Sequence, residues 1–297
     1  MLRSLYSGVS GLKNHQTKMD VIGNNIANVN TVGFKSSRVT FQDIYSQTLK
    51  PASAPAAGSG GTNPQQIGLG VSVGTIDTMF TRSAAEYTGS PLDLSIEGDG
   101  FFVVNDGAAD YFTRAGNFTT DADSNLINAN GLIVQGWMAT PITADHDADP
   151  ATPDAITGYD PIDPANMTAA NMDNIQMPEE YYDITISKTG EIIGINSITQ
   201  DRDVIGRIAI ANFNNQNALS KMGNNLYDVS QNSGLPQIGA PGVDGTAYLN
   251  PSALEMSNVD LAKEFTDMII TQRGFQANSR VITTSDSLLE ELVNLKR

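Results

Sequence analysis

Two histidines are the side chains of this sequence best suited to acid–base chemistry. His15 lies in a heptad-patterned N-terminal segment, and His146 lies in an acidic, proline-containing stretch. A Ser-His-Asp triad requires a histidine held between a nucleophile and a carboxylate. Neither histidine lies in a segment that suggests such an arrangement, and the 297 residues include no cysteine. We therefore expect no nucleophilic catalytic site.

Two aspartate-containing stretches could bind calcium. The stretch "DADSN" at 121–125 is like the opening of an EF-hand loop, but its sixth position is Leu126 where glycine is required and its twelfth is Leu132 where glutamate is required. A second stretch at 145–149 has proline at the sixth position and isoleucine at the twelfth. Both are predicted to be turns, so no metal site is expected.

No cofactor is expected either. The glycines of "GLGVSVG", 68–74, lack the dinucleotide-binding spacing and lead into a predicted strand instead of a helix. No phosphate-binding loop is present.

Charge is distributed unevenly along the chain. The net charge is -16, yet residues 1–50 carry six Lys or Arg against two Asp, a balance of +4. Residues 251–297 have a balance of -2, which leaves -18 for residues 51–250. An acidic middle repels phosphate backbones, so we expect no nucleic-acid partner.

Membrane insertion is not expected, because no run of 18 apolar residues occurs. The opening "MLRSLYSGVSGLKNHQ" interrupts its apolar residues with Ser, Gly, Lys and Asn, unlike a secretory signal. If the protein leaves the cytoplasm, we expect export without cleavage of such a peptide.

The N-terminal segment has a heptad pattern that predicts a helix. One column of the heptad is wholly apolar, and it consists of Leu5, Leu12, Met19 and Ile26. The other column becomes polar or empty halfway along, and it consists of Leu2, Val9, Gln16 and Gly23. The segment therefore has half of a coiled-coil seam.

The C-terminal segment repeats this arrangement. Its apolar column consists of Leu261, Met268, Phe275, Ile282 and Leu289. Its second column is polar in the centre and consists of Phe265, Gln272, Ser279, Asp286 and Val293. Two half-seams favour either an intramolecular helical hairpin that closes one domain, or ends that are mobile in the monomer and become ordered when other copies supply the missing surface.

The stretch "NNIANVNTVGFK" places four asparagines in seven residues at the end of the first predicted helix. One interpretation is a helix stop, with Asn30 or Gly33 as the left-handed residue. The other is a hydrogen-bonding surface between subunits, in which Asn24, Asn25 and Asn28 contact other copies.

The middle of the chain changes to a period of two, which predicts strands. The apolar runs lie within 71–80, 92–104, 111–120, 126–137, 183–187, 191–195 and 204–213, with Asn130-Gly131 as a hairpin turn. From 115 to 187 there is no Lys or Arg against twelve Asp and Glu. We expect a mixed α and β fold: a helical coiled-coil domain (1–30 plus 256–297), an extended connector (31–70), a β-rich domain (71–138 plus 183–250) and a small outward-facing acidic insertion (139–182).

Several motifs resemble those of the bacterial flagellar axial proteins, the rod and hook family. They are "MDVIGNNIANVNTVGFK" at 19–35, "SPLDLSIEGDGFFVV" at 90–104, "GLIVQGW" at 131–137, and the C-terminal segment from "SNVDLAKEF" onward. The resemblance implies that the terminal helices pair as a coiled coil lining a tube, with the β domain outside it. It also implies a mechanical role, export through the flagellar type III apparatus, and contacts between copies that never close into a ring.

Within that family, "VTFQDIYSQTL", "SNVDLAKEF" and the insertion after "VQGW" are similar to hook sequences. The resemblance implies as partners other copies of the chain, the rod, hook-cap and hook–filament junction proteins, and the export apparatus. A distal rod subunit is the alternative within the family. A secreted β-scaffold enzyme or a calcium-binding adhesin is the alternative from another class, and the failed loop patterns argue against it. The residues expected at the assembly interface are Leu5, Leu12, Met19, Asn24, Asn25, Ile26, Asn28, Leu261, Phe265, Met268, Gln272, Phe275, Ile282 and Leu289.

Overall fold

The computed structural model describes residues 2–55, 60–143, 156–159, 167, 171–243 and 245–295. The chain forms two compact units. The first, here called the helical unit, contains Met1–Val29, Ser36–Met79 and Val259–Arg297. The second, here called the β unit, contains Asn30–Lys35 and Phe80–Asn258. Two long helices and a large β-rich middle confirm the predicted mixed α and β fold.

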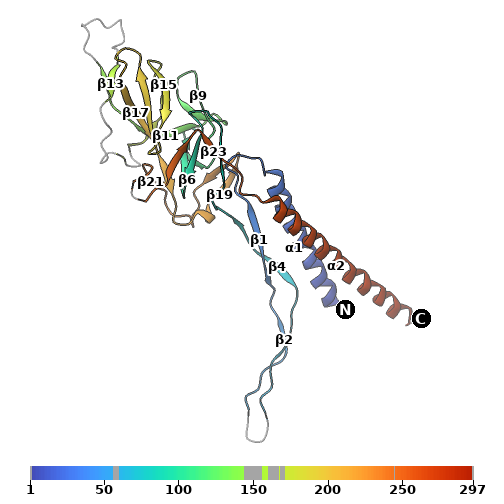
Figure 1. The fold of residues 1–297 in the computed structure, drawn as a ribbon. Helices are drawn as coiled ribbons and strands as arrows, with labels where there is room; N and C mark the ends of the chain where they lie inside the picture. Colours follow the sequence, from blue (N-terminus) through green and yellow to red (C-terminus); the bar gives the residue numbers. More distant parts are fainter. Residues whose placement is uncertain are drawn as a thin grey trace. The chain divides into compact units, whose positions relative to one another are not determined.

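The helical unit is built on the two ends of the chain. Helix α1 spans Leu2–Ala27 and helix α2 spans Leu261–Asn294, and the two lie side by side (Figure 1). Asp260 caps α2, because its side chain accepts hydrogen bonds from the backbone N–H groups of Ala262 and Lys263. This cap satisfies two of the amides that a helix N-terminus leaves without intrahelical partners.

Four strands complete the described part of the helical unit. Strand β1 (Ser37–Asp43) pairs antiparallel with β4 (Val71–Thr78), and β2 (Gln47–Lys50) pairs antiparallel with β3 (Gln65–Ile67). The segment expected to be an extended connector, 31–70, therefore contains β1, β2 and β3. Strand β4 was expected within the β-rich domain, but its hydrogen-bonded partner is β1.

The β unit contains a 13-stranded sheet among its described residues. Its main path runs β15-β16-β17-β11-β7-β8-β20-β19, with β9, β10, β14, β18 and β21 attached beside it. The bounds are β7 Phe101–Asn105, β8 Asp110–Thr113, β9 Phe118–Thr120, β10 Leu126–Asn128, β11 Ile133–Met138, β14 Asp173–Asn174, β15 Tyr181–Ile186, β16 Glu191–Asn196, β17 Arg202–Ile208, β18 Ile210–Asn212, β19 Ser220–Gly223, β20 Leu226–Asp228 and β21 Gln237–Gly239. Each apolar run predicted to be a strand overlaps one or more of the observed strands.

Smaller elements surround this sheet. Strand β6 (Leu94–Glu97) pairs with β22 (Tyr248–Pro251), and β5 (Ala85–Tyr87) pairs with β23 (Ala253–Glu255). Strands β12 (Pro141–Thr143) and β13 (Ile156–Tyr159) form a hairpin, and a short 3-10 helix, η3, spans Gln216–Ala218. The pairings of β5 and β6 bring the last strands of the β unit back to its beginning.

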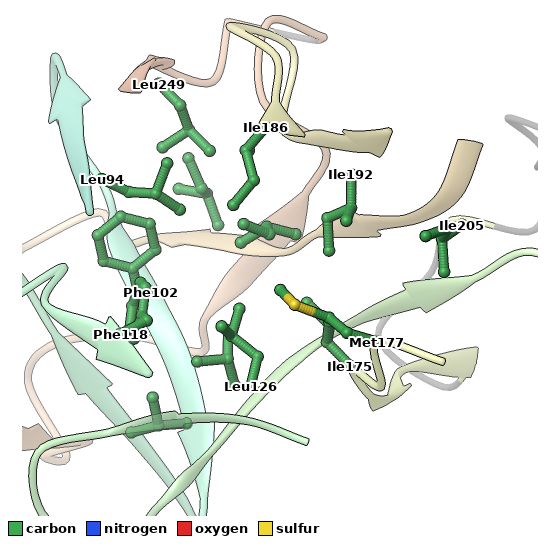
Figure 2. Close-up of a cluster of buried hydrophobic side chains, with 14 of the residues drawn as sticks. Leu94, Phe102, Phe118, Leu126, Ile175, Met177, Ile186, Ile192, Ile205 and Leu249 are labelled. Carbon is green, nitrogen blue, oxygen red and sulfur yellow. The ribbon is translucent and has the colours of Figure 1, made fainter. Parts of the chain in front are cut away.

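Strand β7 separates two hydrophobic cores. Successive side chains of a strand point to opposite faces. Accordingly, Phe102 and Val104 belong to one buried cluster and Phe101 and Val103 belong to another. Figure 2 shows the first cluster, in which Leu94, Phe102 and Phe118 from the early strands meet Ile186, Ile192 and Leu249 from the late ones. The early and late parts of the β unit therefore share one core.

The segment expected to be an outward-facing insertion, 139–182, also contributes to this core. Ile175, Met177 and Tyr181 are buried in the first cluster, and β14 pairs with β11. Most of 144–170, including His146 and the acidic stretch at 145–149, lies outside the described residues. The described end of the segment is thus part of the β unit, because its apolar residues alternate with polar ones in the manner of a half-buried strand.

Candidate assembly surface

The helices α1 and α2 approach each other closely where one of them carries glycine. Gly11 faces Asn278 so closely that a Cβ atom added to the glycine would lie 2.5 Å from the amide nitrogen of Asn278. A Cβ atom added to Gly274 would lie 2.8 Å from the imidazole of His15. Nearer the β unit along the chain, Lys18 Nζ and Asp267 Oδ1 are 3.8 Å apart. Residue numbers rise along α1 as they fall along α2, so the helices are antiparallel.

The face of α2 that packs in the helical unit follows a heptad. Among the half-buried and buried positions of α2, one set recurs at alternating steps of three and four: Met268, Thr271, Phe275, Asn278, Ile282, Ser285 and Leu289. The predicted apolar column therefore lies on this face, except for Leu261, which is exposed at the start of the helix.

The second column of this face differs from the one expected. It consists of Thr271, Asn278 and Ser285, each one residue before the expected Gln272, Ser279 and Asp286. Asn278 of this column faces Gly11 of α1, and Thr271 and Ser285 are buried, so the side of α2 that carries them is the packed one. Phe265, which is 50% exposed, and Gln272 lie on the outward side.

Helix α1 shows the same division. Its apolar column, Leu5, Leu12, Met19 and Ile26, is half-buried. Its other predicted column is exposed at Val9, Gln16 and Gly23. With Tyr6, Lys13 and Asp20, these residues form a continuous exposed stripe, here called the outer stripe of α1.

The asparagines at the end of α1 make contacts within the chain. Asn25 is 2% exposed, its Nδ2 donates to the carbonyl of Ser37 at 2.9 Å, and its Oδ1 accepts from the N–H of Ser37 at 3.0 Å. The Nδ2 of Asn28 donates to the carbonyl of Asn24 at 2.9 Å, one turn earlier. Asn25 thus joins the end of α1 to the start of β1, a role that the sequence reasoning missed.

The remaining part of the motif, 30–35, belongs to the β unit. Gly33 has φ of +67°, and a Cβ atom there would lie 2.7 Å from the backbone nitrogen of Ala115, so glycine is required by both conformation and space. Asn225 donates to the carbonyl of Val32 at 3.0 Å, and the ammonium of Lys221 lies 5.2 Å from the ring centroid of Phe34.

The groups considered for chemistry do not converge in the described residues. No group of three or more His, Asp or Glu that could hold a metal ion occurs in the described part of the chain. The stretch 121–125 forms a turn closed by the Asp121 N–H and the Asn125 carbonyl at 3.0 Å. Burial, and secondarily the charge of Lys18, lower the pKa of His15. None of the helices in the described ranges is long and apolar enough to cross a membrane.

The chain combines paired terminal helices that have exposed apolar faces with a β-rich unit, and the comparisons with known proteins identify its class. Three family models match: "Flagella basal body rod protein" over residues 5–35, "Flagellar hook protein FlgE/F/G D1 domain" over 95–194, and "Flagellar basal body rod FlgEFG protein C-terminal" over 250–295. The chain belongs to the flagellar rod and hook protein family, whose members are structural components of the bacterial flagellum.

Relatives of both kinds match the whole chain. The flagellar basal-body rod protein FlgG of Bacillus subtilis is 48% identical over 298 residues, covering 100% of each chain. The flagellar hook protein FlgE of Borreliella burgdorferi is 34% identical over 442 residues, and the rod protein FlgG of the same organism is 34% identical over 304 residues, each covering 100% of both chains. The chain is therefore a rod or hook structural subunit.

Proposed function

We propose that this chain is a subunit of the flagellar hook, which assembles with other copies into a helical tube and transmits torque from the motor to the filament. The observation that carries the proposal is the comparison within Borreliella burgdorferi. Its hook and rod proteins are equally identical to the chain, at 34%, but the hook alignment spans 442 residues and the rod alignment 304. At 34% of each alignment, the hook relative shares about 150 identical positions with this chain and the rod relative about 103, although the 442 hook positions exceed the 297 residues of the chain and so include positions without a counterpart in it.

The exposed faces of the helices supply the contact surface for other copies. Large apolar side chains of α2 that remain exposed in the single chain include Phe265, Ile269, Ile270, Val281, Leu288, Leu292 and Val293. Full burial of one such side chain is worth about 1.5–3 kcal/mol. Together with the outer stripe of α1, they give each subunit two different surfaces, and contacts between different surfaces can propagate without closing.

In this proposal the half-buried columns hold α1 and α2 together as a coiled coil, and the exposed residues contact neighbouring copies. The predicted interface residues Phe265, Gln272 and Asn24 are on the exposed side, while Met268 and Phe275 act through the pairing of the helices. The helical unit would line the tube and the β unit would lie outside it. Export without a cleaved signal peptide, and contacts with the rod, hook-cap and junction proteins, belong to the same proposal.

A distal rod subunit is the second candidate. It is favoured by the 48% identity to the Bacillus subtilis rod protein over the full length of both chains. The two functions require different mechanical properties, because a joint must bend as it rotates and a drive shaft must not.

Electron microscopy of tubes grown from the purified chain tests the choice. A hook subunit should form curved tubes that vary in curvature from one to the next, whereas a rod subunit should form straight tubes. Expression in flagellated cells that lack their own hook gene, or their own distal rod gene, gives the second measurement. Restoration of motility only in the cells lacking the rod gene would contradict the hook proposal.

A further inference from the structure

The β unit is entered and left by the chain through a small number of segments. The β unit consists of 30–35 and 80–258, so these segments are 30–35 itself, the first residues of the longer stretch, 80–83, and its last residues, 255–258. Hydrogen bonds join the last of these segments, 255–258, to each of the other two. They are Gly33 N–H to Glu255 O at 2.8 Å, Asn258 N–H to Phe34 O at 3.4 Å, Ser83 Oγ to Ser257 O at 2.8 Å, and Asn258 Nδ2 to Thr81 Oγ1 at 3.0 Å. We call these three segments the root of the β unit.

The carboxylate of Glu255 lies at the centre of the root. Its Oε1 is 2.7 Å from Lys35 Nζ and accepts from the Ser83 N–H at 3.3 Å, while its Oε2 is 3.2 Å from Arg114 Nη1. Lys35 also donates to the Thr81 carbonyl at 2.8 Å. One side chain therefore collects donors from both other segments of the root and from the residue that follows β8.

All three charges of this cluster are buried. Lys35 is 0% exposed, Arg114 is 1% and Glu255 is 2%. Arg114 also donates to the Gly98 carbonyl at 2.8 Å and stacks its guanidinium 5.4 Å from the ring centroid of Phe101. Burial of charge is unfavourable even when the charges are paired, and apolar residues of similar volume often stabilise a protein as well or better. A charged and hydrogen-bonded cluster instead makes the geometry specific, because its hydrogen bonds and ion pairs can all form in only one arrangement of the three segments.

We propose that Glu255 is a positioning residue that fastens the three segments of the root, so that the β unit stays closed there whether or not the terminal helices are packed. Burial of the exposed apolar faces of α1 and α2 against other copies would favour a rearrangement of the helices during assembly. A root fastened by its own side chains isolates the β unit from that rearrangement. The proposal holds for a hook or a rod subunit alike, and its test requires no polymer.

The test measures amide hydrogen exchange on the full-length chain. Glu255→Gln keeps the shape of the side chain and removes its charge. We expect the amides of Ser83 and Gly33 to exchange at least about tenfold faster, while those of β7 change less than about twofold. The matched control is Glu97→Gln, which removes an exposed pair of similar geometry, Arg82 Nη2 to Glu97 Oε1 at 2.6 Å, and should change neither set. Unchanged exchange at Ser83 and Gly33, or an equal increase throughout β7, would overturn the proposal.

Two further variants distinguish the positioning role of Glu255 from a contribution to overall stability and from an effect of the packing between α1 and α2. In Phe275→Asp, which puts a charge between the helices, the amides of Ser83 and Gly33 should stay protected, and loss of their protection would show that the helices hold the root. The triple variant Lys35→Met, Arg114→Met, Glu255→Leu should melt no lower than the parent yet exchange the Ser83 amide about tenfold faster. If Glu255→Gln does not fold, the triple variant decides: a protected Ser83 amide in it would refute the positioning role.

Discussion

Asn25 and Ser37 exchange two hydrogen bonds, from Asn25 Nδ2 to the Ser37 carbonyl and from the Ser37 N–H to Asn25 Oδ1. The side-chain amide thus pairs with the first residue of β1 as a neighbouring strand would. The two residues are twelve positions apart in the sequence, and residues 30–35 between them belong to the other unit. The asparagine therefore fixes where the chain returns to the helical unit, in addition to any part that α1 plays in assembly.

Replacing Asn25 by Ala should destabilise the helical unit by about 1–3 kcal/mol, because it leaves a partly buried N–H and carbonyl of Ser37 without this partner. Asn25→Asp should behave similarly, since it keeps the acceptor but loses the donor. Urea unfolding followed by the helical circular dichroism signal gives the measurement. Asn24→Ala, at an exposed position one residue earlier, is the control and should change stability by less than about 0.7 kcal/mol. Equal effects of the two alanine variants would contradict the assigned role.

Replacing Phe275 by Asp should separate the helices and abolish polymerisation while leaving the β unit folded. Phe275 is on the packed face of α2, where a charge without a partner is unfavourable. Met268→Asp should have the same effect. We expect the strand signal in circular dichroism to remain and sedimentation to detect no polymer. Normal tubes from either variant would mean that this face is not the seam.

Replacing Phe265 by Asp should have a different effect. Phe265 is on the outward side of α2, so the single chain should keep its helix content and melting temperature. Polymerisation should still fail or require a higher concentration, because the side chain would otherwise be buried by another copy. The critical concentration is the measurement. A variant with the parent's critical concentration would remove Phe265 from the assembly surface.

The sequence predicted the elements better than their faces. Heptads at both ends correctly indicated two helices, and the apolar columns are half-buried as their composition suggests, apart from the exposed Leu261. The polar column of α2 was placed one residue too late. From the apolar residue Met268, a step of three reaches Thr271 and a step of four reaches Gln272, and both steps fit a helical period of 3.6 almost equally. The choice depends on which side of α2 packs in the helical unit, where Asn278 faces Gly11 of α1 and where Thr271 and Ser285 are buried. It therefore requires knowledge of contacts between residues distant in sequence.

Contacts distant in sequence were the part that could not be predicted. Nothing local marks Glu255 as the partner of Lys35, since 220 residues separate them. The same limitation applies to 171–182, whose acidic surroundings suggested an exposed insertion although its apolar residues complete a core built by strands on both sides of it. The composition of a segment indicates its average exposure to solvent, but it does not show which individual side chains are buried.

Replacing Ile175 by Ala therefore should destabilise the β unit by about 2–5 kcal/mol, the usual cost of truncating a fully buried Ile. Deleting the whole of 139–182 should unfold the β unit, because Met177 and Tyr181 leave the core with it. Thermal unfolding followed by near-ultraviolet circular dichroism measures the stability of both variants. A deletion variant that melts at the parent's temperature would restore the interpretation of the entire segment as a separate insertion.

Mild acid should loosen the helix pair through His15. Its imidazole lies against Gly274 of α2 and edge-on to Phe41 of β1, and its Nδ1 has no hydrogen-bond partner among the described residues. Burial and the positive charge of Lys18 lower its pKa below 6.5, so the unfolded chain takes up this proton at a higher pH than the folded chain does. Stability contributed by the neutral imidazole is therefore complete above pH 6.5 and declines as the pH falls from there toward the folded-state pKa. Urea midpoints measured from about pH 7.5 to about pH 5.5, above the range in which ordinary carboxylates titrate, should fall in the parent and stay nearly level in His15→Gln. Parallel curves for the two proteins would assign the acid sensitivity to other groups.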